Sequence, residues 1–181
     1  MAKLISWNLM TLDGYVAGPG GNIDWHMDVW GPELEALSDA QGKEAGALMF
    51  GRVTYDLMAG HWPNETGTTA DYMNALPKFV FSRTLTESPW RNTTMFNGDA
   101  AETVTRLKRD TAKDIYLFGS SDLAGSLIPH GLIDEFRVCV VPRLIGGGIP
   151  LFKPGAKQKL DLADTQTLAT GGVILRYTRA A

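Results

Sequence analysis

The sequence predicts an α/β fold in which a mixed, mainly parallel central sheet is flanked by helices and ends in an antiparallel hairpin. Short apolar runs alternate with segments of helical periodicity along most of the chain. Several of these runs end at a glycine or a serine that is followed directly by a helix, as in the connections of parallel sheets. Near the C-terminus, Thr170-Gly171-Gly172 separates two strand-like segments, which is a hairpin signal.

The N-terminal segment is expected to form a strand over residues 3–11 that ends in a turn at residues 12–14. Turn-forming residues then open a long loop over residues 18–30, which contains Trp25 and Trp30. Two interpretations of this loop remain open. Its tryptophans could be exposed on a mobile lid over a pocket, or they could pack into the protein and hold the loop in place.

The middle of the chain is expected to alternate strands and helices. Pro32 opens a helix with Glu33 and Glu35 in its first turn, where the helix dipole favours acidic side chains. Asp99 and Glu102 resemble a capping box at the start of a later helix. The other expected elements are strands over residues 47–50, 78–81 and 93–96 and helices over residues 53–59 and 69–75.

The clearest strand-to-helix junction lies in residues 114–123. Its apolar run ends at Gly119, and good N-cap residues for a helix follow at Ser120, Ser121 and Asp122. The free N–H groups at such a helix start can bind a phosphate group. An ordinary, well-capped junction explains the same residues, so both interpretations remain open at this point.

Two other strand ends carry residues suited to a phosphorylated ligand. Gly51 ends the strand of residues 47–50 directly before a helix, so a second helix start could hold another phosphate. Ser82 and Arg83 directly follow the strand of residues 78–81. A hydroxyl group and a guanidinium group suit a phosphate monoester, because arginine binds it with two hydrogen bonds.

The C-terminal part of the chain is expected to contain a strong strand and a closing hairpin. The strand covers residues 136–141, and the hairpin strands cover residues 160–168 and 173–178. The glycine-rich loop of residues 144–150 lacks the Lys-Ser/Thr pair of a phosphate-binding loop. It therefore indicates backbone flexibility or a close approach of two chain segments.

The composition is that of an ordinary globular protein of 181 residues, and we expect residues 1–181 to form one domain. A net charge of −3 without a basic cluster argues against nucleic-acid binding, and the apolar runs are too short to span a membrane. A single cysteine, Cys139, and three scattered histidines predict neither a disulfide nor a metal site. Because the first residues enter a strand directly, we expect no signal peptide and a cytoplasmic location.

Four motifs, in this order, resemble the dihydrofolate reductase superfamily. They are residues 11–17 (TLDGYVA), 51–55 (GRVTY), 81–84 (FSRT) and 117–123 (LFGSSDL). A further set resembles the C-terminal signature of one branch, the riboflavin-biosynthesis pyrimidine reductases or RibD C-terminal domain-like proteins. It consists of residues 134–136 (DEF), 142–148 (PRLIGGG) and 151–152 (LF). The resemblance covers nearly the whole chain and implies a dihydrofolate reductase-like fold.

The resemblance implies an NADPH-dependent reductase that transfers hydride to a heterocyclic, pyrimidine- or pteridine-like substrate, similar to 5-amino-6-(5-phosphoribosylamino)uracil reductase. In such proteins the first-strand turn lies near the nicotinamide, the two glycine junctions hold the diphosphate, and the Ser-Arg-Thr strand end meets the 2′-phosphate. The implied cofactor-binding residues are Thr11, Leu12, Asp13, Gly14, Gly51, Arg52, Thr54, Ser82, Arg83, Phe118, Gly119, Ser120, Ser121, Asp122 and Leu123. Dihydrofolate reductases have a cis peptide bond at the position of Gly119-Ser120, so a cis bond is an open question here.

The substrate side resembles the superfamily less closely. An ungapped comparison places Glu35 where dihydrofolate reductases carry the carboxylate that protonates the pterin, with Asp39 one turn later on the same helix face. Both could instead be solvated helix carboxylates. Two other functions remain open, a non-catalytic nucleotide- or ligand-binding protein on the same fold and a dihydrofolate reductase proper. The resemblance and the apolar strand edges of the C-terminal half also point to a homodimer.

Overall fold

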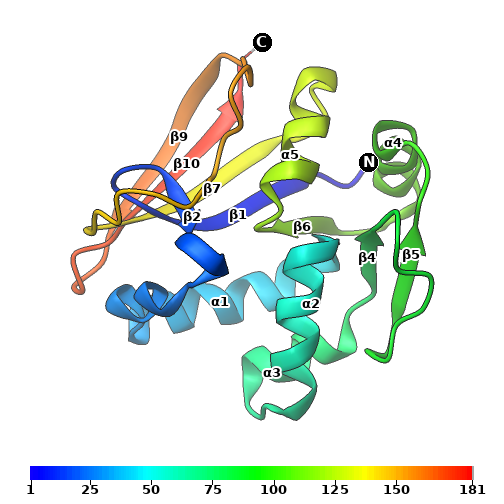
Figure 1. Ribbon diagram of the computed structural model, residues 1–181, viewed down its shortest axis with the longest axis horizontal. Coiled ribbons are helices and arrows are strands. Elements are labelled where there is room, and N and C mark those ends of the chain that lie inside the picture. The colour runs from blue at the N-terminus through cyan, green and yellow to red at the C-terminus, as the bar shows by residue number, and fades with distance from the viewer. Residues whose placement is uncertain (181) are drawn as a thin grey trace.

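The structure is a computed structural model that describes residues 1–180 (Figure 1). Its centre is an eight-stranded sheet with the strand order β5-β4-β3-β6-β1-β7-β10-β9. These strands are β1 (Leu4–Thr11), β3 (Ala45–Gly51), β4 (Lys78–Phe81), β5 (Thr93–Phe96), β6 (Asp114–Phe118), β7 (Glu135–Val141), β9 (Leu160–Thr167) and β10 (Val173–Arg179). A small second sheet pairs β2 (Tyr15–Ala17) with β8 (Ile149–Pro150).

The six strands from β5 to β7 in this order are parallel, and β10 and β9 extend the sheet as an antiparallel hairpin. Parallel neighbours need connections that cross over the sheet, and most of these connections carry helices. The helices are α1 (Pro32–Glu44), α2 (Arg52–His61), α3 (Thr68–Ala75), α4 (Ala100–Asp110) and α5 (Ser121–Leu127). The fold class expected from the sequence, a mixed and mainly parallel α/β sheet with a C-terminal hairpin, is confirmed.

Helices cover both faces of the sheet, and each face has its own hydrophobic core. On one face Leu34 of α1, Tyr55 of α2 and Met73 of α3 pack with strand residues such as Phe50. On the other face α4 and α5 contribute a second cluster that includes Met49. Successive residues of β3 therefore point to opposite cores, as the two-residue period of a strand requires. In Figure 1, α1 to α3 lie below the sheet and α5 lies above it.

Two local sequence signals produce the expected geometry. The Asp99 carboxylate accepts a hydrogen bond from the Glu102 amide at 2.8 Å and so caps α4. In the closing hairpin, Gly171 has a φ of 90°, which favours glycine, and the Leu168 amide donates to the Gly172 carbonyl oxygen at 2.8 Å. The turn chemistry read from the sequence thus fixes both the helix start and the hairpin.

The loop over residues 18–30 is held in place by its aromatic side chains. It contains two short 3₁₀ helices, η1 (Pro19–Gly21) and η2 (Asp24–Val29). Trp25 is 4% exposed within the core on the α1 side, and Trp30 packs against the same core. The interpretation of a loop pinned by its tryptophans is therefore confirmed, and that of a lid with exposed aromatics is wrong.

The glycine-rich loop after β7 makes the close chain approach that the sequence indicates. A Cβ atom at Gly148 would lie only 2.1 Å from the carbonyl oxygen of Ala17. The Asp13 carboxylate accepts hydrogen bonds from the amides of Ile145 and Gly146 at 3.0 and 2.8 Å. These contacts fix the loop to the turn after β1 and to the small β2–β8 sheet.

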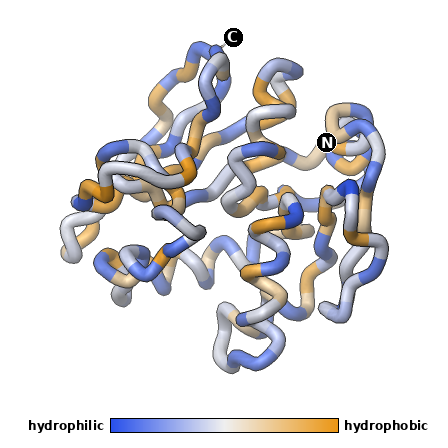
Figure 2. Tube along the Cα trace, viewed as in Figure 1, coloured by the Kyte–Doolittle hydropathy of each residue, from blue (hydrophilic) through white to orange (hydrophobic). Residues whose placement is uncertain are grey.

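Hydrophobic residues recur along the strands and on the helices that pack against them, interrupted by hydrophilic residues (Figure 2). This distribution is typical of amphipathic elements around a shared core. Across residues 1–180, no helix combines the length and the apolar character that crossing a membrane would need.

Candidate functional site

The strand ends identified in the sequence lie along one edge of the central sheet. Strands β4, β3, β6 and β1 are consecutive and parallel, so their carboxyl ends face the same way. These ends are Phe81, Gly51, Phe118 and Thr11. Ligands of open parallel α/β sheets bind outside this edge, and we refer to it below as the carboxyl edge.

Hydrogen bonds join the two glycine junctions at the carboxyl edge. The Gly51 amide donates to the Ser120 hydroxyl oxygen at 2.7 Å, and the Ser120 amide donates to the Thr54 hydroxyl oxygen at 3.1 Å. The Ser120 hydroxyl also lies 3.0 Å from both Thr54 Oγ1 and the Phe118 carbonyl oxygen. The starts of α2 and α5 are therefore neighbours. Such proximity is required if the two helix starts are to bind two phosphate groups of one ligand.

The close contact between the junctions explains why a glycine follows β6. A Cβ atom at Gly119 would lie 2.8 Å from Thr54 Oγ1, and Gly119 has a φ of 54°. Ser120 also adopts a positive φ of 60°. The peptide bond between them is trans, as are the other peptide bonds of residues 1–180. The chain therefore makes this turn without a cis bond, through two consecutive residues in the left-handed conformation.

Both helix starts lack a side-chain cap among the residues described, so their first N–H groups are not satisfied in that way. The structure corrects the N-cap expectation for α5. Ser120 occupies the N-cap position, but its hydroxyl bonds toward Gly51 and Thr54 instead of the helix. Ser121 is 5% exposed, and its hydroxyl has no hydrogen-bond partner within residues 1–180. Asp122 forms an ion pair with Lys153.

The Ser-Arg strand end has a different geometry from the one expected for a phosphate monoester. Ser82 is buried, and its hydroxyl oxygen accepts hydrogen bonds from the amides of Thr84 and Leu85 at 3.1 and 2.8 Å. It therefore shapes the turn, as serine commonly does at such positions. Arg83 is exposed and forms no ion pair in the described part of the chain. Arg52 pairs with Asp56 at 2.7 Å, and both side chains are about half exposed.

The turn after β1 is rigid. The Tyr15 amide donates to Thr11 Oγ1 at 3.0 Å, and Gly14 has a φ of 92°. The Thr11 hydroxyl, together with the amides of Gly146 and Ile145, holds the pKa of Asp13 below its usual range. Asp13 therefore stays ionised and links the turn to the glycine-rich loop, while Leu12 is 65% exposed at the carboxyl edge.

The two carboxylates predicted as proton donors lie away from the buried face of α1. That face carries Leu34 and Gln41, which are 1% and 2% exposed. Glu35 is exposed and Asp39 is partly exposed. Of the residues described, neither lines the cavity beneath the second half of α1. Their placement agrees with the alternative interpretation of solvated helix carboxylates.

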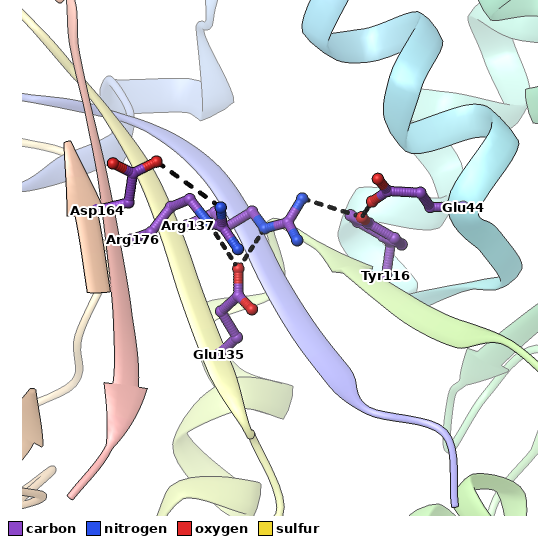
Figure 3. A network of polar contacts seen from close by, with 6 residues as sticks. All are labelled: Glu44, Tyr116, Glu135, Arg137, Asp164 and Arg176. Carbon is purple, nitrogen blue, oxygen red and sulfur yellow. Dashed lines mark hydrogen bonds and ion pairs between the residues drawn. The ribbon is translucent and has the colours of Figure 1, made fainter. Parts of the chain in front are cut away.

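A buried polar network lies between α1 and the C-terminal strands, and the sequence reading missed it (Figure 3). Glu135 and Arg137 on β7 are 3% and 8% exposed. One oxygen of Glu135 accepts from Arg137 Nε at 2.5 Å and from Arg176 Nε at 3.0 Å. The other end of Arg137 donates to the Tyr116 hydroxyl at 3.0 Å, and this hydroxyl donates to Glu44 at 3.2 Å.

The charges in this network shift the pKa values of its members. Burial alone would raise the pKa of Glu135, but the hydrogen bonds and charges of Arg137 and Arg176 outweigh it and hold that pKa below its usual range. Burial, with the nearby carboxylates, raises the pKa of Tyr116 above its usual value even though Arg137 opposes this. Glu135 is therefore ionised and Tyr116 neutral at physiological pH. The sequence does carry a signal for this network, because Glu135 and Arg137 are charged residues within an otherwise apolar strand.

The network borders a cavity of about 180 Å³ between α1 and strands β7, β9 and β10. Gln41 and Glu44 line it from α1, and Arg137, Asp164 and Arg176 line it from the strands. Within residues 1–180, including this cavity, no three His, Cys, Asp or Glu side chains gather closely enough to hold a metal ion. The carboxyl edge and this cavity are both polar features that could hold a ligand.

The architecture defines the class of the protein as a dihydrofolate reductase-like fold. The dihydrofolate reductase of Enterococcus faecalis, solved in complex with NADP(H), superposes with a TM-score of 0.67 at 12% identity. The superposition covers 99% of this chain and 97% of that one. At this identity the similarity establishes the fold alone.

The chain belongs to the RibD C-terminal domain family, whose family model matches residues 2–175. One relative is the uncharacterised protein YyaP of Bacillus subtilis (strain 168), which is 34% identical over 176 residues. That alignment covers 93% of this chain and 90% of YyaP. A solved protein of Shewanella sp. PV-4, assigned to riboflavin biosynthesis, superposes over 100% of both chains with a TM-score of 0.83 at 23% identity. The resemblance stated from the motifs is therefore confirmed at the level of the family.

Proposed function

We propose that the protein is an NADPH-dependent reductase that transfers hydride to a heterocyclic, pyrimidine- or pteridine-like substrate, in the manner of 5-amino-6-(5-phosphoribosylamino)uracil reductase. The observation that carries this proposal is the pair of neighbouring helix starts, α2 and α5, joined through Ser120 at the carboxyl edge. Adjacent helix starts present N–H donors to the two phosphates of a dinucleotide. Membership of the RibD C-terminal domain family supports a reductase. In this proposal residues 1–181 act as one domain.

The residues at the helix starts fit the diphosphate of such a cofactor. A Cβ atom at Gly51 or Gly119 would meet Ser120 or Thr54, so these glycines let the two turns pack against each other. The buried Ser121 hydroxyl has no partner in residues 1–180 and can donate to a phosphate oxygen. Thr54 and Ser120 hold the two turns at a fixed separation through their mutual hydrogen bonds. When bound, NADPH supplies the hydride, and the protein supplies orientation and exclusion of water.

Selectivity for NADPH over NADH would come mainly from Arg83. The two cofactors differ by one phosphate that carries nearly two negative charges, so only a site that pairs this charge can distinguish them. The Ser82 hydroxyl shapes the turn that precedes Arg83, and the guanidinium is exposed at the carboxyl edge. Arg52 is a weaker candidate, because a phosphate would compete with its ion pair to Asp56.

The test is a titration of the protein with NADPH and NADH, followed by NADPH oxidation with two substrate classes. The classes are a ribosylaminopyrimidine, as used by the pyrimidine reductases, and dihydrofolate. We expect tighter binding of NADPH than of NADH and oxidation with at least one heterocycle. Equal affinity for the two nucleotides would contradict the proposed cofactor, and turnover with dihydrofolate alone would instead identify a dihydrofolate reductase proper.

A non-catalytic nucleotide-binding protein on the same fold is the second candidate. It is favoured by the exposed position of Glu35 and the partly exposed position of Asp39 on α1, which leave no assigned proton donor among the described residues. Binding of NADPH without turnover of any heterocycle would favour this candidate.

A further inference from the structure

The strand order gives the proposed cofactor site a direction along the carboxyl edge. Arg83 follows β4, the starts of α2 and α5 follow β3 and β6, and Leu12 and Arg143 follow β1 and β7. In the proposed function the 2′-phosphate lies at Arg83 and the diphosphate at the two helix starts. The reactive end of the same cofactor therefore extends toward β1 and β7. A substrate must meet it there, a placement that rests on the proposed function.

Three segments at this end are tied together and present apolar side chains to solvent. The Leu12 amide donates to the Arg143 carbonyl oxygen at 2.9 Å, and Arg143 Nε lies 2.8 Å from the Asp28 carboxylate on η2. Leu12, Met27 and Leu144 are 65%, 67% and 69% exposed. We refer to these five residues as the β1–β7 wall. Apolar side chains beside the reactive end of a cofactor suit the flat face of a heterocyclic ring.

The charge at this end of the edge is negative. Residues 12–30 and 142–152, which include the wall, contain the carboxylates of Asp13, Asp24 and Asp28 and one guanidinium, that of Arg143. His26 adds no charge near neutral pH, because burial lowers its pKa to about 4. Arg143 is already paired with Asp28. A phosphate monoester carries nearly two negative charges, so on these two described segments it meets repelling carboxylates and no unpaired cation.

The glycine-rich loop does not compensate for the missing cation. Backbone amides of such loops bind phosphate groups in many proteins. Here the amides of Ile145 and Gly146 donate to the Asp13 carboxylate at 3.0 and 2.8 Å. Asp13 stays ionised, because the Thr11 hydroxyl and these amides hold its pKa below its usual range. The protein's own carboxylate therefore occupies the position at which these amides would bind an anion.

We propose that the substrate is an uncharged pyrimidine- or pteridine-like heterocycle without a phosphate group, and that its ring packs on the β1–β7 wall. Leu12 and Leu144 provide the apolar contact, and the carboxylates of this end disfavour a phosphorylated competitor. Arg83 is exposed and forms no ion pair in the described part of the chain, so phosphate binding belongs to the opposite end of the edge. The protein would share the reaction of a 5-amino-6-(5-phosphoribosylamino)uracil reductase but not its phosphorylated substrate.

The test uses matched ligands that differ only in a phosphate group. Calorimetric titration of the full chain saturated with NADP⁺, which cannot donate hydride, compares 5-amino-6-ribosylaminouracil with its 5′-phosphate. A second pair, 6-hydroxymethylpterin and its phosphate, covers the pteridine class. In at least one pair we expect the unphosphorylated ligand to bind about 5-fold or more tightly, because exposed like charges repel each other weakly.

Three results would overturn the proposal, namely equal binding within each pair, tighter binding of the phosphorylated ligand, and no binding of any of the four ligands to the NADP⁺ complex. A parent protein that binds no NADP⁺ would contradict the proposed function itself and remove the substrate site with it. The two failures are therefore distinguished by the NADP⁺ titration that precedes the ligand titrations.

A pair of variants tests the charge on the wall. Asp28→Asn leaves Arg143 without its carboxylate partner, so it should strengthen binding of the phosphorylated ligand by about 5-fold and leave the unphosphorylated ligand unchanged. Asp24→Asn is the matched control on η2. Its effect should be smaller, because the Asp24 carboxylate bonds to Asn22 and its removal frees no cation. An unchanged ligand preference in Asp28→Asn would refute the role of charge in substrate choice.

A third variant tests the apolar contact. Leu144→Ser should weaken binding of the unphosphorylated ligand by about 5-fold, since less apolar surface is buried against the ring. The side chain is 69% exposed, so the midpoint of urea unfolding and the affinity for NADP⁺ should stay as in the parent. Unchanged binding of the unphosphorylated ligand in Leu144→Ser would remove the wall from the substrate site.

Discussion

The Gly51 amide donates a 2.7 Å hydrogen bond to the hydroxyl oxygen of Ser120, 69 residues away in the sequence. This bond connects the carboxyl ends of β3 and β6 and brings the starts of α2 and α5 together. Each junction alone is an ordinary strand-to-helix turn. Their connection through one serine is what makes a two-phosphate site geometrically reasonable, and it supplies a single position at which the site can be tested.

We expect Ser120→Ala to lower the free energy of unfolding by about 1–3 kcal/mol, because the Gly51 amide loses its partner in a partly buried place. The affinity for NADPH should fall by roughly 10-fold as the two helix starts lose their fixed separation. Ser126→Ala is the matched control on α5, since it removes a hydroxyl that only donates to the Leu123 carbonyl oxygen. Urea unfolding and NADPH titration check both variants, and an effect of equal size in the control would contradict the role of Ser120.

The second expectation concerns the 2′-phosphate. Arg83→Ala should weaken NADPH binding by about 10-fold or more and leave NADH binding unchanged, because a charge-assisted hydrogen bond contributes about 1.5–3 kcal/mol. Arg52→Ala should have a smaller effect, since Arg52 already pairs with Asp56 at 2.7 Å. Fluorescence titration with each nucleotide measures the selectivity. A parallel loss of NADPH and NADH affinity in Arg83→Ala would remove this residue from the 2′-phosphate site.

The strands and turns of the carboxyl edge could be predicted because their signals are local. Gly51 and Gly119 each end an apolar run directly before a helical pattern, and parallel strands place such ends together. The turn made by the Ser82 hydroxyl was not predicted, since serine suits both a turn and a phosphate. The network of Glu135, Arg137 and Arg176 depends on the pairing of β7 with β10, which brings residues about forty positions apart side by side, and no local pattern reports that register.

The third expectation tests whether the carboxylates on α1 donate a proton in the reaction or are only solvated by water. Because Glu35 is exposed and Asp39 partly exposed, we expect Glu35→Gln and Asp39→Asn each to leave the pH profile of NADPH oxidation unchanged. Steady-state rates across acidic and neutral pH measure this directly. If one variant loses the acidic limb of the profile, that residue is the proton donor and the sequence-based assignment is restored.

The fourth expectation is a homodimer. The sequence suggests it through the apolar strand edges of the C-terminal half, and the structure leaves few of these edges free. Strand β7 is covered on both sides by β1 and β10, and β8 pairs with β2. In the C-terminal half, β9 forms one edge of the central sheet, and its Leu162 is 58% exposed. An unpaired strand edge with an apolar side chain is suited to pairing with a second copy. Light scattering should give twice the 19.7 kDa of one chain, and Leu162→Lys should shift the mass toward that of a single chain. A mass of one chain for the parent at micromolar concentration would refute the dimer.

The last expectation is a pH dependence of stability that comes from His26. Burial lowers the pKa of His26 to about 4, and a contact with the Val16 backbone only partly opposes this. Its Nε2 is buried without a hydrogen-bond partner in residues 1–180, and its ring stands edge-on to Trp25 at 4.3 Å between centroids. The folded state therefore holds the imidazole neutral, whereas the unfolded chain binds a proton near pH 6.5.

Because the folded pKa of His26 is depressed, its contribution to stability is complete above the unfolded value of about 6.5 and is lost as the pH falls toward about 4. The full loss is on the order of 3 kcal/mol, since each unit of pKa difference corresponds to about 1.4 kcal/mol. His26→Gln should flatten the pH dependence of the free energy of unfolding over this interval, and His130→Gln, at an exposed position, should leave it as in the parent. Urea unfolding at several pH values measures all three proteins. An identical slope in the parent and His26→Gln would show that other groups control acid stability.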